Sequence, residues 1–367
     1  MKIGIITIHF GFNYGSALQA YALSKYINST FDDIEAYVIN YIPERYSKKN
    51  RYIKTAKEYR FLKRGMYLLA VAPFQMYVQY IFNKFLKSYV PMTRRVSNKE
   101  EAQEVSKDME ILIAGSDQIW NSDYNGGIDP IYYLEFAGTE KRKVSYAASC
   151  GKNDYDKKEW EIIDNFLKFF SYISLREEDS LNLFRSHGYI EAVQSLDPVF
   201  LINKNEWKKI ERKPGKSLKK YVLIYCLDSD ETELIRIARQ IARERNLKIA
   251  MAAYCHIWNY YDVDMLYRNK SPNEFLWLVS HADYIVTNSF HGVAFSINLE
   301  KQFVAVKRKK YNCRLDSILK IMGLSDRYIG KGDKFYGTGD IDYNTVNLYK
   351  QDFLSISKEY LSNILCS

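Results

Sequence analysis

Short runs of β-branched and aromatic residues alternate with longer helix-like stretches along this chain of 367 residues. In the first half, the pattern predicts strands at Lys2–Ile8, Glu35–Tyr41, Glu110–Ala114, Lys143–Ala148 and Tyr172–Leu175. Helices are predicted between them at Ser16–Asn28, about Lys54–Tyr89, Lys157–Phe170 and Glu177–His187. Alternation of this kind is typical of α/β proteins, in which helices cover both faces of a parallel sheet.

The same alternation restarts in the second half of the chain. Strands are predicted at Tyr221–Leu227, Leu247–Ala253, Tyr284–Thr287 and Gln302–Val306. Helices are predicted at Glu231–Arg245, Pro272–Ser280, Phe290–Asn298 and Arg314–Met322. A chain of this length is comfortable for two domains of roughly 150–200 residues each. We therefore predict two Rossmann-like domains with the active site in the cleft between them.

A charged stretch that contains Pro214 and Gly215 separates the two halves, and it reads as an interdomain linker. We predict an N-terminal domain over residues 1–203, a linker over 204–220 and a C-terminal domain over 221–343. The last segment, 344–367, has a helical pattern between Asn344 and Leu365. We expect this helix to pack back on the first domain.

The cysteines and the net charge limit the compartment and the partners. Five scattered cysteines without a CxxC pair argue against a disulfide framework or a zinc site and for a reducing compartment. The N-terminus enters a strand at its second residue without a signal-peptide pattern. A net charge of +9 suits anionic partners, but Lys and Arg are spread over many helices rather than gathered in a nucleic-acid module. We predict a cytoplasmic protein that does not bind nucleic acid.

The stretch from Arg64 to Leu86 is apolar enough to raise the question of membrane contact. It is broken by Pro73, Gln75 and Gln79 and falls short of the roughly 20 apolar residues that a membrane span needs. Flanking lysines would suit a helix that lies on an anionic membrane surface. The favoured alternative is a pair of amphipathic helices that cover a core.

The stretch DYIVTNSFHGVAFSINL, from Asp283 to Leu299, joins an apolar strand to an apolar helix through polar residues. Asn288, Ser289 and His291 stand at that junction, and Gly292 follows them. Open α/β sheets bind ligands at the carboxyl ends of their strands, and a helix N-terminus favours an anion. The stretch therefore predicts an anion site.

The first predicted strand runs into a comparable junction, HFGFNYGSALQAYAL. Gly11 and Gly15 permit a tight turn, and Ser16 is suited to be the N-cap of the helix that follows. The loop is neither GxGxxG nor a Walker A motif, so a purely structural turn is an equally good interpretation.

Two other strand ends carry chemistry. In ILIAGSDQIWN, Asp117 and Gln118 can hold sugar hydroxyls and Trp120 offers a flat face to a sugar ring, while Asn121 follows. The alternative is an Asx-turn at Asp117 with Trp120 in the core. In YISLREEDS, Arg176 ends a strand and can form a fork for phosphate or carboxylate, or pair with the acids beside it.

The segment SLDPVFL places Asp197 before a proline, which indicates a turn and no chemistry of its own. Arg314, in NCRLDSIL, lies at a further strand-to-helix passage. No GxSxG nucleophile elbow and no metal-ligand cluster is visible in the sequence, so we predict no bound metal and no cofactor.

Taken in order, the stretches NYGSALQAYAL, AGSDQIWN, SYAASCG, ISLREEDS, LDPVFL, VTNSFHGVAFSINL and NCRLDSIL resemble the polysaccharide pyruvyl transferase family. The resemblance implies a fold similar to glycosyltransferase B. It also implies transfer of pyruvate from phosphoenolpyruvate to two hydroxyls of a sugar, with release of phosphate. The acceptor would belong to a surface or capsular polysaccharide precursor, often lipid-linked, which would suit peripheral contact with the inner face of the membrane.

The family's motifs match this chain at Ser289, His291 and Gly292, at Arg176 and at Arg314, and the resemblance implies that these residues form the donor site. From the chemistry of the side chains we expect His291 to act as the acid–base group. Asp117 would act as a second base, or it would orient the acceptor together with Gln118. The expected donor-binding residues are Arg176, Arg314, Ser289, Asn288, Gly292, Gly15 and Ser16. The expected acceptor-binding residues are Gln118, Trp120, Asn121 and Asn13.

Two other functions compete with pyruvyl transfer. A glycosyltransferase that uses a sugar nucleotide has the same fold and also binds a phosphorylated donor, so the fold does not exclude it. A non-enzymatic binder of anionic polymers is a second alternative, and a steep loss of binding with salt would identify it.

Overall fold

A computed structural model describes residues 1–46, 61–226, 231–253, 263–308, 311–330, 332–333 and 339–366, with side chains of the long helix from residue 73 onward. Two six-stranded sheets form its two halves. Each sheet is parallel throughout. The predicted α/β class with two parallel sheets is confirmed.

The first sheet has the strand order β3-β2-β1-β4-β5-β6. Its strands are β1 (Lys2–Ile6), β2 (Glu35–Tyr41), β3 (Met92–Val96), β4 (Ile111–Ala114), β5 (Arg142–Ser145) and β6 (Phe170–Tyr172). The second sheet repeats the order as β11-β10-β9-β12-β13-β14. Its strands are β9 (Tyr221–Tyr225), β10 (Lys248–Ala253), β11 (Met265–Arg268), β12 (Tyr284–Thr287), β13 (Gln302–Val306) and β14 (Tyr328–Ile329).

This strand order is that of a Rossmann fold, and it reverses direction between the first and fourth strands of each sheet. Ligands of such sheets bind in the crevice that opens beyond the strand ends at this reversal. In the first sheet the reversal lies between β1 and β4, and in the second between β9 and β12. The loops that follow β1, β4 and β12 are those in which the sequence placed candidate site residues.

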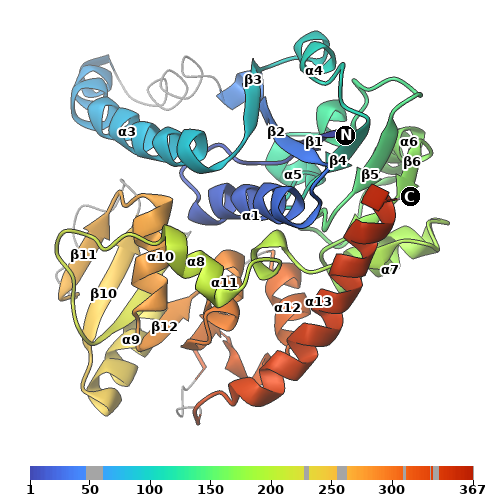
Figure 1. The fold of residues 1–367 in the computed structure, drawn as a ribbon. Coiled ribbons are helices and arrows are strands. Elements are labelled where there is room, and N and C mark those ends of the chain that lie inside the picture. Colours follow the sequence, from blue (N-terminus) through green and yellow to red (C-terminus); the bar gives the residue numbers. More distant parts are fainter. Residues whose placement is uncertain are drawn as a thin grey trace.

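Helices cover both sheets and fill the space between them (Figure 1). Those of the first half are α1 (Tyr14–Thr30), α3 (Phe61–Tyr89), α4 (Lys99–Val105), α5 (Ser122–Asn125), α6 (Lys157–Leu167) and α7 (Glu178–Ser186). Those of the second half are α8 (Lys204–Ile210), α9 (Thr232–Arg245), α10 (Pro272–Ser280), α11 (Phe290–Asn298), α12 (Cys313–Ile321) and α13 (Tyr343–Cys366).

Helices α1 and α11 lie at the centre of the molecule, between the two sheets (Figure 1). Every residue of α11 is buried, and so is most of α1. Tyr14 of α1 stacks on Phe275 of α10, with ring centroids 4.4 Å apart and ring planes within 9°. One cluster of buried apolar residues includes Ile5 of the first sheet and Leu223 of the second. The two halves therefore share a continuous core around these helices.

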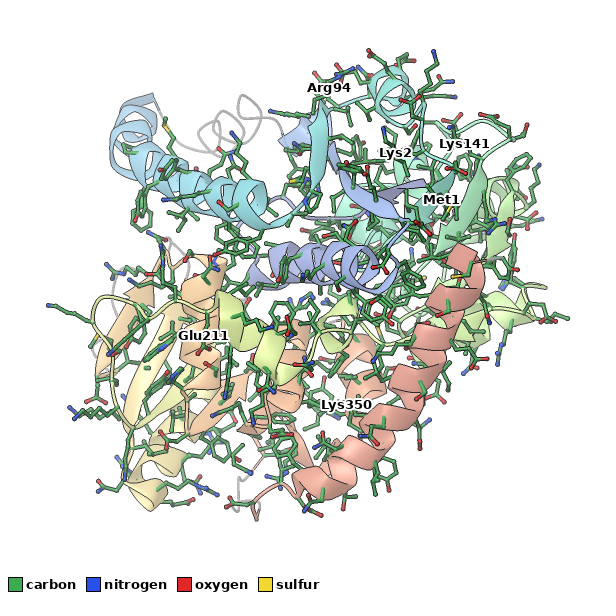
Figure 2. All side chains as sticks on the ribbon, in the orientation of Figure 1. Met1, Lys2, Arg94, Lys141, Glu211 and Lys350 are labelled. Carbon is green, nitrogen blue, oxygen red and sulfur yellow. The ribbon has the colours of Figure 1, made fainter. Side chains whose placement is uncertain are left out.

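Several predicted strands are shorter in the structure. The predicted strand Lys143–Ala148 ends at Ser145, because Ala147 has a left-handed backbone with φ of 48°. The predicted strand Tyr172–Leu175 is divided between β6 and β7 (Ser174–Leu175), and β7 pairs with β8 (Val193–Gln194) instead. The edge strand β3 was missed because its arginines mask the apolar alternation. Arg94 lies at the outer edge of the molecule, where it pairs with Glu104 of α4 (Figure 2).

The charged segment after residue 203 contains α8, capped by Asn203, whose side-chain oxygen accepts from the backbone N–H of Glu206. Trp207 of this helix is buried, and its ring lies 5.1 Å from that of Phe295 in α11. At the other end of the chain, α13 reaches the first half (Figure 1). There the Tyr360 hydroxyl donates to the Ser145 carbonyl over 2.7 Å.

Helix α3 runs as one helix through Pro73, whereas a pair of helices was expected. Its buried side includes Val78, Phe82 and Phe85, and its exposed apolar side chains include Met76 and Tyr80. None of the helices among the described residues combines the length and the apolar character needed to cross a membrane. Contact of this helix with a membrane surface stays a prediction.

Candidate active site

A pocket of about 470 Å³ lies where the strand ends of the two sheets face each other. It is lined by the following residues proposed from the sequence: Asn13, Ser16, Asp117, Gln118, Asn121, Ser289, His291 and Arg314. The lining also includes residues that the sequence did not indicate: Asp123, Tyr124, Phe290, Arg308 and Tyr311. Both halves of the chain thus contribute to one pocket at the point predicted by the strand order.

Asp117 forms the acidic side of the pocket. Its backbone is left-handed with φ of 70°, which turns the chain sharply after β4. Its Oδ2 atom accepts a hydrogen bond of 2.5 Å from the Ser16 hydroxyl of α1. Burial alone would raise the pKa of Asp117, but attraction to His291 and Arg176 lowers it below its ordinary value. The carboxylate is therefore ionised at neutral pH.

His291 lies opposite Asp117, in the first turn of α11. The side chain is buried, and its Nε2 atom has no hydrogen-bond partner among the described residues. The nearest carboxylate oxygen is Oδ2 of Asp197, 3.7 Å from Nε2. Burial lowers the pKa of His291, although Asp197 and Asp117 offset part of this effect. The imidazole is therefore neutral near pH 7 and able to accept a proton.

Arg176 is buried within a network of ion pairs behind the pocket. Its Nη1 atom lies 2.7 Å from Asp197 Oδ2, and its Nε atom lies 3.0 Å from Glu177 Oε1. The guanidinium also stacks on the Phe290 ring, 4.1 Å from the centroid. Although burial alone would lower the pKa of Arg176, the two carboxylates raise it. Its Nη2 atom keeps no partner among the described residues.

Asp197 was interpreted as a turn residue without chemistry, and that interpretation is incomplete. It does cap the 3₁₀-turn η3 (Pro198–Phe200), by accepting from the backbone N–H of Val199. It also binds Arg176 and accepts a hydrogen bond of 3.1 Å from the Ser116 hydroxyl. Because its partners lie far away in the sequence, only an Asp–Pro turn was visible there.

Arg314 lies in the first turn of α12 and lines the pocket. The residue is 7% exposed, no carboxylate of the described chain forms an ion pair with it, and its Nε atom has no hydrogen-bond partner there. Burial, followed by repulsion from Arg176, lowers the pKa of Arg314. Asp117 and Glu177 offset part of this effect without forming an ion pair. A buried cation that lacks a direct ion pair is expensive, and a helix N-terminus adds to this cost. This position therefore favours a bound anion.

The N-termini of α1 and α11, which both lie at the pocket, are closed by their own caps. Helix α1 begins at Tyr14, so its N-cap is Asn13 rather than Ser16 as expected. The Asn13 side chain accepts from the backbone N–H of Gly15 over 3.0 Å. In α11, the Ser289 hydroxyl accepts from the backbone N–H of Gly292 over 3.3 Å. The N–H groups of both glycines are therefore occupied by these caps, and a role of the two glycines in binding the donor stays a prediction.

Gly292 and Asn288, two of the expected donor-binding residues, make contacts within the protein. A Cβ atom on Gly292 would lie 2.3 Å from Thr287 Oγ1, so this glycine allows α11 to pack closely on β12. The Asn288 amide donates to Cys226 Sγ over 3.4 Å, and Asn288 is not among the residues that line the pocket. Gly292 thus brings α11 close to β12, and Asn288 ties the end of β12 to the residue that follows β9.

The acceptor-binding prediction for Trp120 is wrong. The side chain is buried, stacks on Tyr133 and Phe184, and donates from Nε1 to the Tyr132 carbonyl. The alternative interpretation, in which the indole fills the core, is therefore the correct one. Asn121 does reach the pocket, but it also caps α5 and donates to Gln118 Oε1 over 2.8 Å.

Apart from Phe290 in α11, the pocket residues that the sequence did not indicate lie in irregular or very short elements. Arg308 and Tyr311 precede α12, and Asp123 and Tyr124 belong to the one-turn helix α5. No periodic pattern marks such positions. Among the residues that the structure describes, no group of three or more His, Cys, Asp or Glu side chains could hold a metal ion.

Solved structures with the same arrangement include a UDP-GlcNAc 2-epimerase from Neisseria meningitidis bound to UDP-GlcNAc. It is 10% identical with a TM-score of 0.55, and the match covers 100% of both chains. A putative UDP-N-acetylglucosamine 2-epimerase from Listeria monocytogenes is 9% identical with a TM-score of 0.53, over 98% of this chain and 89% of the other. At such identities the likeness shows the fold alone, and it confirms the predicted glycosyltransferase-B-like arrangement of two Rossmann-like domains.

Comparison with sequences gives a more specific result. No curated protein matches the chain. The family model described as polysaccharide pyruvyl transferase matches residues 13–310, which include the candidate site residues from Asn13 to Arg308. Because this match spans most of the chain, the protein belongs to the polysaccharide pyruvyl transferase family.

Proposed function

We propose that this protein transfers pyruvate from phosphoenolpyruvate to two hydroxyls of a saccharide and releases phosphate. The observation that carries the proposal is Arg314, a buried cation at the pocket without a carboxylate partner in the described chain. Phosphoenolpyruvate is rich in negative charge, and guanidinium groups bind both phosphate and carboxylate as a fork.

In this proposal Arg314 contacts the donor directly, whereas Arg176 acts from behind the pocket. The charge of Arg176 is already shared with Asp197 and Glu177, and within the described part of the chain its Nη2 atom has no partner. Groups that are held in place before the reaction stabilise developing charge without reorganising. Arg314 therefore supplies affinity, and Arg176 holds Asp197 and Glu177 in place behind the pocket.

The chemistry requires one proton to be delivered and two to be removed. The double bond of phosphoenolpyruvate takes a proton at its methylene carbon, which leaves cationic character at the central carbon. A sugar hydroxyl attacks that carbon and gives its proton to a base, phosphate leaves with the electrons of its C–O bond, and a second hydroxyl closes the ketal. Water supplies the proton that the methylene carbon takes. Neutral His291 accepts the first hydroxyl proton, and ionised Asp117 can accept the second. One of these two protons leaves on the phosphate as hydrogen phosphate, and the other returns to water.

The acceptor would enter from the side of α5, where Gln118, Asn121 and Tyr124 line the pocket. Amide and hydroxyl groups can donate to and accept from sugar hydroxyls. The reaction as written uses phosphoenolpyruvate as a co-substrate and needs no metal or redox cofactor.

Thermal unfolding tests donor binding without an acceptor. We expect phosphoenolpyruvate to raise the melting temperature more than inorganic phosphate does. The stabilisation should be about 2.7 kcal/mol at roughly a hundredfold excess over the dissociation constant. Arg314→Gln should abolish the shift. Arg95→Gln is the matched control, because Arg95 is exposed on the edge strand β3.

A second experiment tests the reaction itself. Phosphate release from phosphoenolpyruvate is measured with a panel of saccharides. Mass spectrometry then looks for a product whose mass exceeds that of the saccharide by the mass of pyruvic acid minus that of one water. His291→Gln should remove turnover while donor binding remains. Stabilisation by a nucleotide sugar, with no response to phosphoenolpyruvate, would overturn the proposal in favour of a glycosyltransferase.

A further inference from the structure

The first turns of α1 and α11 meet at the pocket, and Gly15 of α1 faces the ring of His291. A Cβ atom built on Gly15 would lie 2.0 Å from His291 Cγ and 2.1 Å from Nδ1. Carbon atoms in contact normally lie about 3.5–4.0 Å apart. Any side chain at position 15 would therefore overlap the imidazole.

The backbone gives no reason for a glycine at this position. Gly15 is not among the glycines with positive φ, so an L-amino acid could adopt its conformation without strain. It lies inside a helix, where alanine is the better residue because glycine leaves the unfolded chain more freedom. The space taken by the His291 ring is the remaining reason for the missing side chain.

Helix α1 is held in place on both sides of Gly15. Tyr14 stacks on Phe275 of α10 and also on Phe82 of α3, with ring centroids 4.4 Å and 5.4 Å apart. On the other side, the Ser16 hydroxyl binds Asp117 over 2.5 Å. The first turn of α1 is therefore tied to three separate parts of the molecule and has little freedom to retreat from the ring.

His291 is held equally firmly from its own side. The side chain is 2% exposed, with Asp197 Oδ2 3.7 Å from Nε2. The start of α11 is fixed by the Ser289 cap and by the close packing of Gly292 on Thr287. A group added at position 15 must therefore displace the imidazole or push the two halves of the molecule apart.

We propose that Gly15 is a positioning residue, whose missing side chain creates the space that holds the His291 ring at the pocket. The effect of Gly15 on turnover rests on the proposed function, because His291 accepts the proton of a sugar hydroxyl in that reaction. The contact couples the two halves of the chain, since α1 follows β1 of the first sheet and α11 follows β12 of the second. The imidazole is then correctly placed only when the halves are packed together.

Kinetics of Gly15→Ala provide the first test. A displacement of about 1 Å can lower turnover by about 10²-fold, so we expect a loss of this size in kcat. The KM for phosphoenolpyruvate should change little, because Arg314 is not touched. Gly215→Ala is the matched control, since a Cβ atom there would meet nothing within 4 Å. Full kcat in Gly15→Ala would overturn the proposal.

A second measurement does not depend on turnover. Burial lowers the pKa of His291, so a displaced ring that gains solvent should titrate closer to the ordinary value of 6.5. NMR titration of the histidines compares wild type, Gly15→Ala and Gly215→Ala, with His291→Gln used to assign the signal. The His291 signal should move in Gly15→Ala alone. An unchanged titration would overturn the proposal.

A double-mutant cycle on stability separates this proposal from the proposed function. In the wild-type background, Gly15→Ala should lower the melting temperature or leave it unchanged, because the overlap cancels the better helix propensity. In the His291→Ala background, the same change should raise it, because the overlap is gone. Equal shifts in both backgrounds would overturn the inference. Failure to turn over phosphoenolpyruvate would instead remove the proposed function, while the cycle and the titration still decide on Gly15.

Discussion

The two buried arginines at the site look alike in the sequence and differ in the structure. Arg176, in the first half, shares its charge with Asp197 and Glu177 and stacks on Phe290. Arg314, in the second half, is buried without a carboxylate partner in the described chain and opens into the pocket. Arg176 has its counter-ions in direct contact, whereas Arg314 is attracted by Asp117 and Glu177 without forming an ion pair with either, and it can pair with an anionic ligand. The comparison separates an arginine that supports the structure from an arginine that is available to a donor.

The difference follows from what surrounds each arginine. Arg176 directly follows β7, and Asp197, which caps η3, lies close enough to bind it. The start of α12, with Arg314, instead lines the pocket between the sheets. The pKa values respond in opposite directions: that of Arg176 is raised by its carboxylates, and that of Arg314 is lowered by burial and by Arg176. Substitution should reveal the same contrast.

The largest expected effect is on stability. Arg176→Met leaves Asp197 and Glu177 buried without their cation, so we expect a loss of about 3–5 kcal/mol in the free energy of unfolding. Arg314→Met removes an unpaired buried charge and should leave stability unchanged or increase it. Urea unfolding measures both variants. Equal losses would contradict the assigned difference between the two arginines.

The next effect concerns donor affinity. Hydrogen bonds to charged groups contribute about 1.5–3 kcal/mol, so Arg314→Met should weaken binding of phosphoenolpyruvate by roughly 10- to 100-fold. Arg314→Lys retains the charge but loses the fork, and it should fall between wild type and Arg314→Met. Titration calorimetry measures the three affinities. If Arg314→Lys binds as weakly as Arg314→Met, the geometry of the fork matters more than the charge.

The pH dependence of stability follows from His291. Because burial lowers its pKa in the folded state, the unfolded chain takes up a proton first as the pH falls. Its contribution to stability is therefore complete above pH 6.5 and is lost below it, down to the folded pKa, with a slope of up to about 1.4 kcal/mol per pH unit. His291→Gln should lack this slope. In Arg314→Met the pH range over which stability is lost should be narrower, because Arg314 helps to lower the pKa of His291.

Urea unfolding between pH 7 and pH 5 compares the three proteins. His9 is also buried with a lowered pKa, but it contributes equally to each of them. The depressed pKa of Asp117 acts in a more acidic range and does not interfere. The difference in slope between wild type and His291→Gln is therefore the contribution of His291, and equal slopes in these two proteins would contradict the prediction.

The smallest effect concerns the caps beside the pocket. Asn13→Ala and Ser289→Ala each remove the side chain that accepts from a first-turn N–H, and each should lower the free energy of unfolding by about 1 kcal/mol. Thermal unfolding detects losses of this size. If either variant also bound the donor more tightly, the freed N–H groups would be additional anion donors alongside Arg314.

Much of the fold and part of the site could be predicted because both depend on local patterns. Buried parallel strands appear as short apolar runs, and their ends meet at one edge of a sheet, which is why Asp117 and His291 were placed there. The prediction for Trp120 failed because an indole at a strand end can turn inward or outward with the same sequence around it. Its inward orientation is decided by Tyr133 and Phe184, which pack against it.

The sequence by itself determined the fold class, the doubled parallel sheet and the edge at which the polar residues gather. Only the tertiary structure decided which charges are paired and how closely the groups approach. Ser16 meets Asp117 across 101 positions, Arg176 meets Asp197 across 21, and the Gly15 backbone touches the ring of His291. Periodicity reports whether a side chain is buried, because burial repeats with the helix or strand. The pairing of side chains depends on how whole sheets and helices pack against each other, so no local pattern in the sequence indicates it.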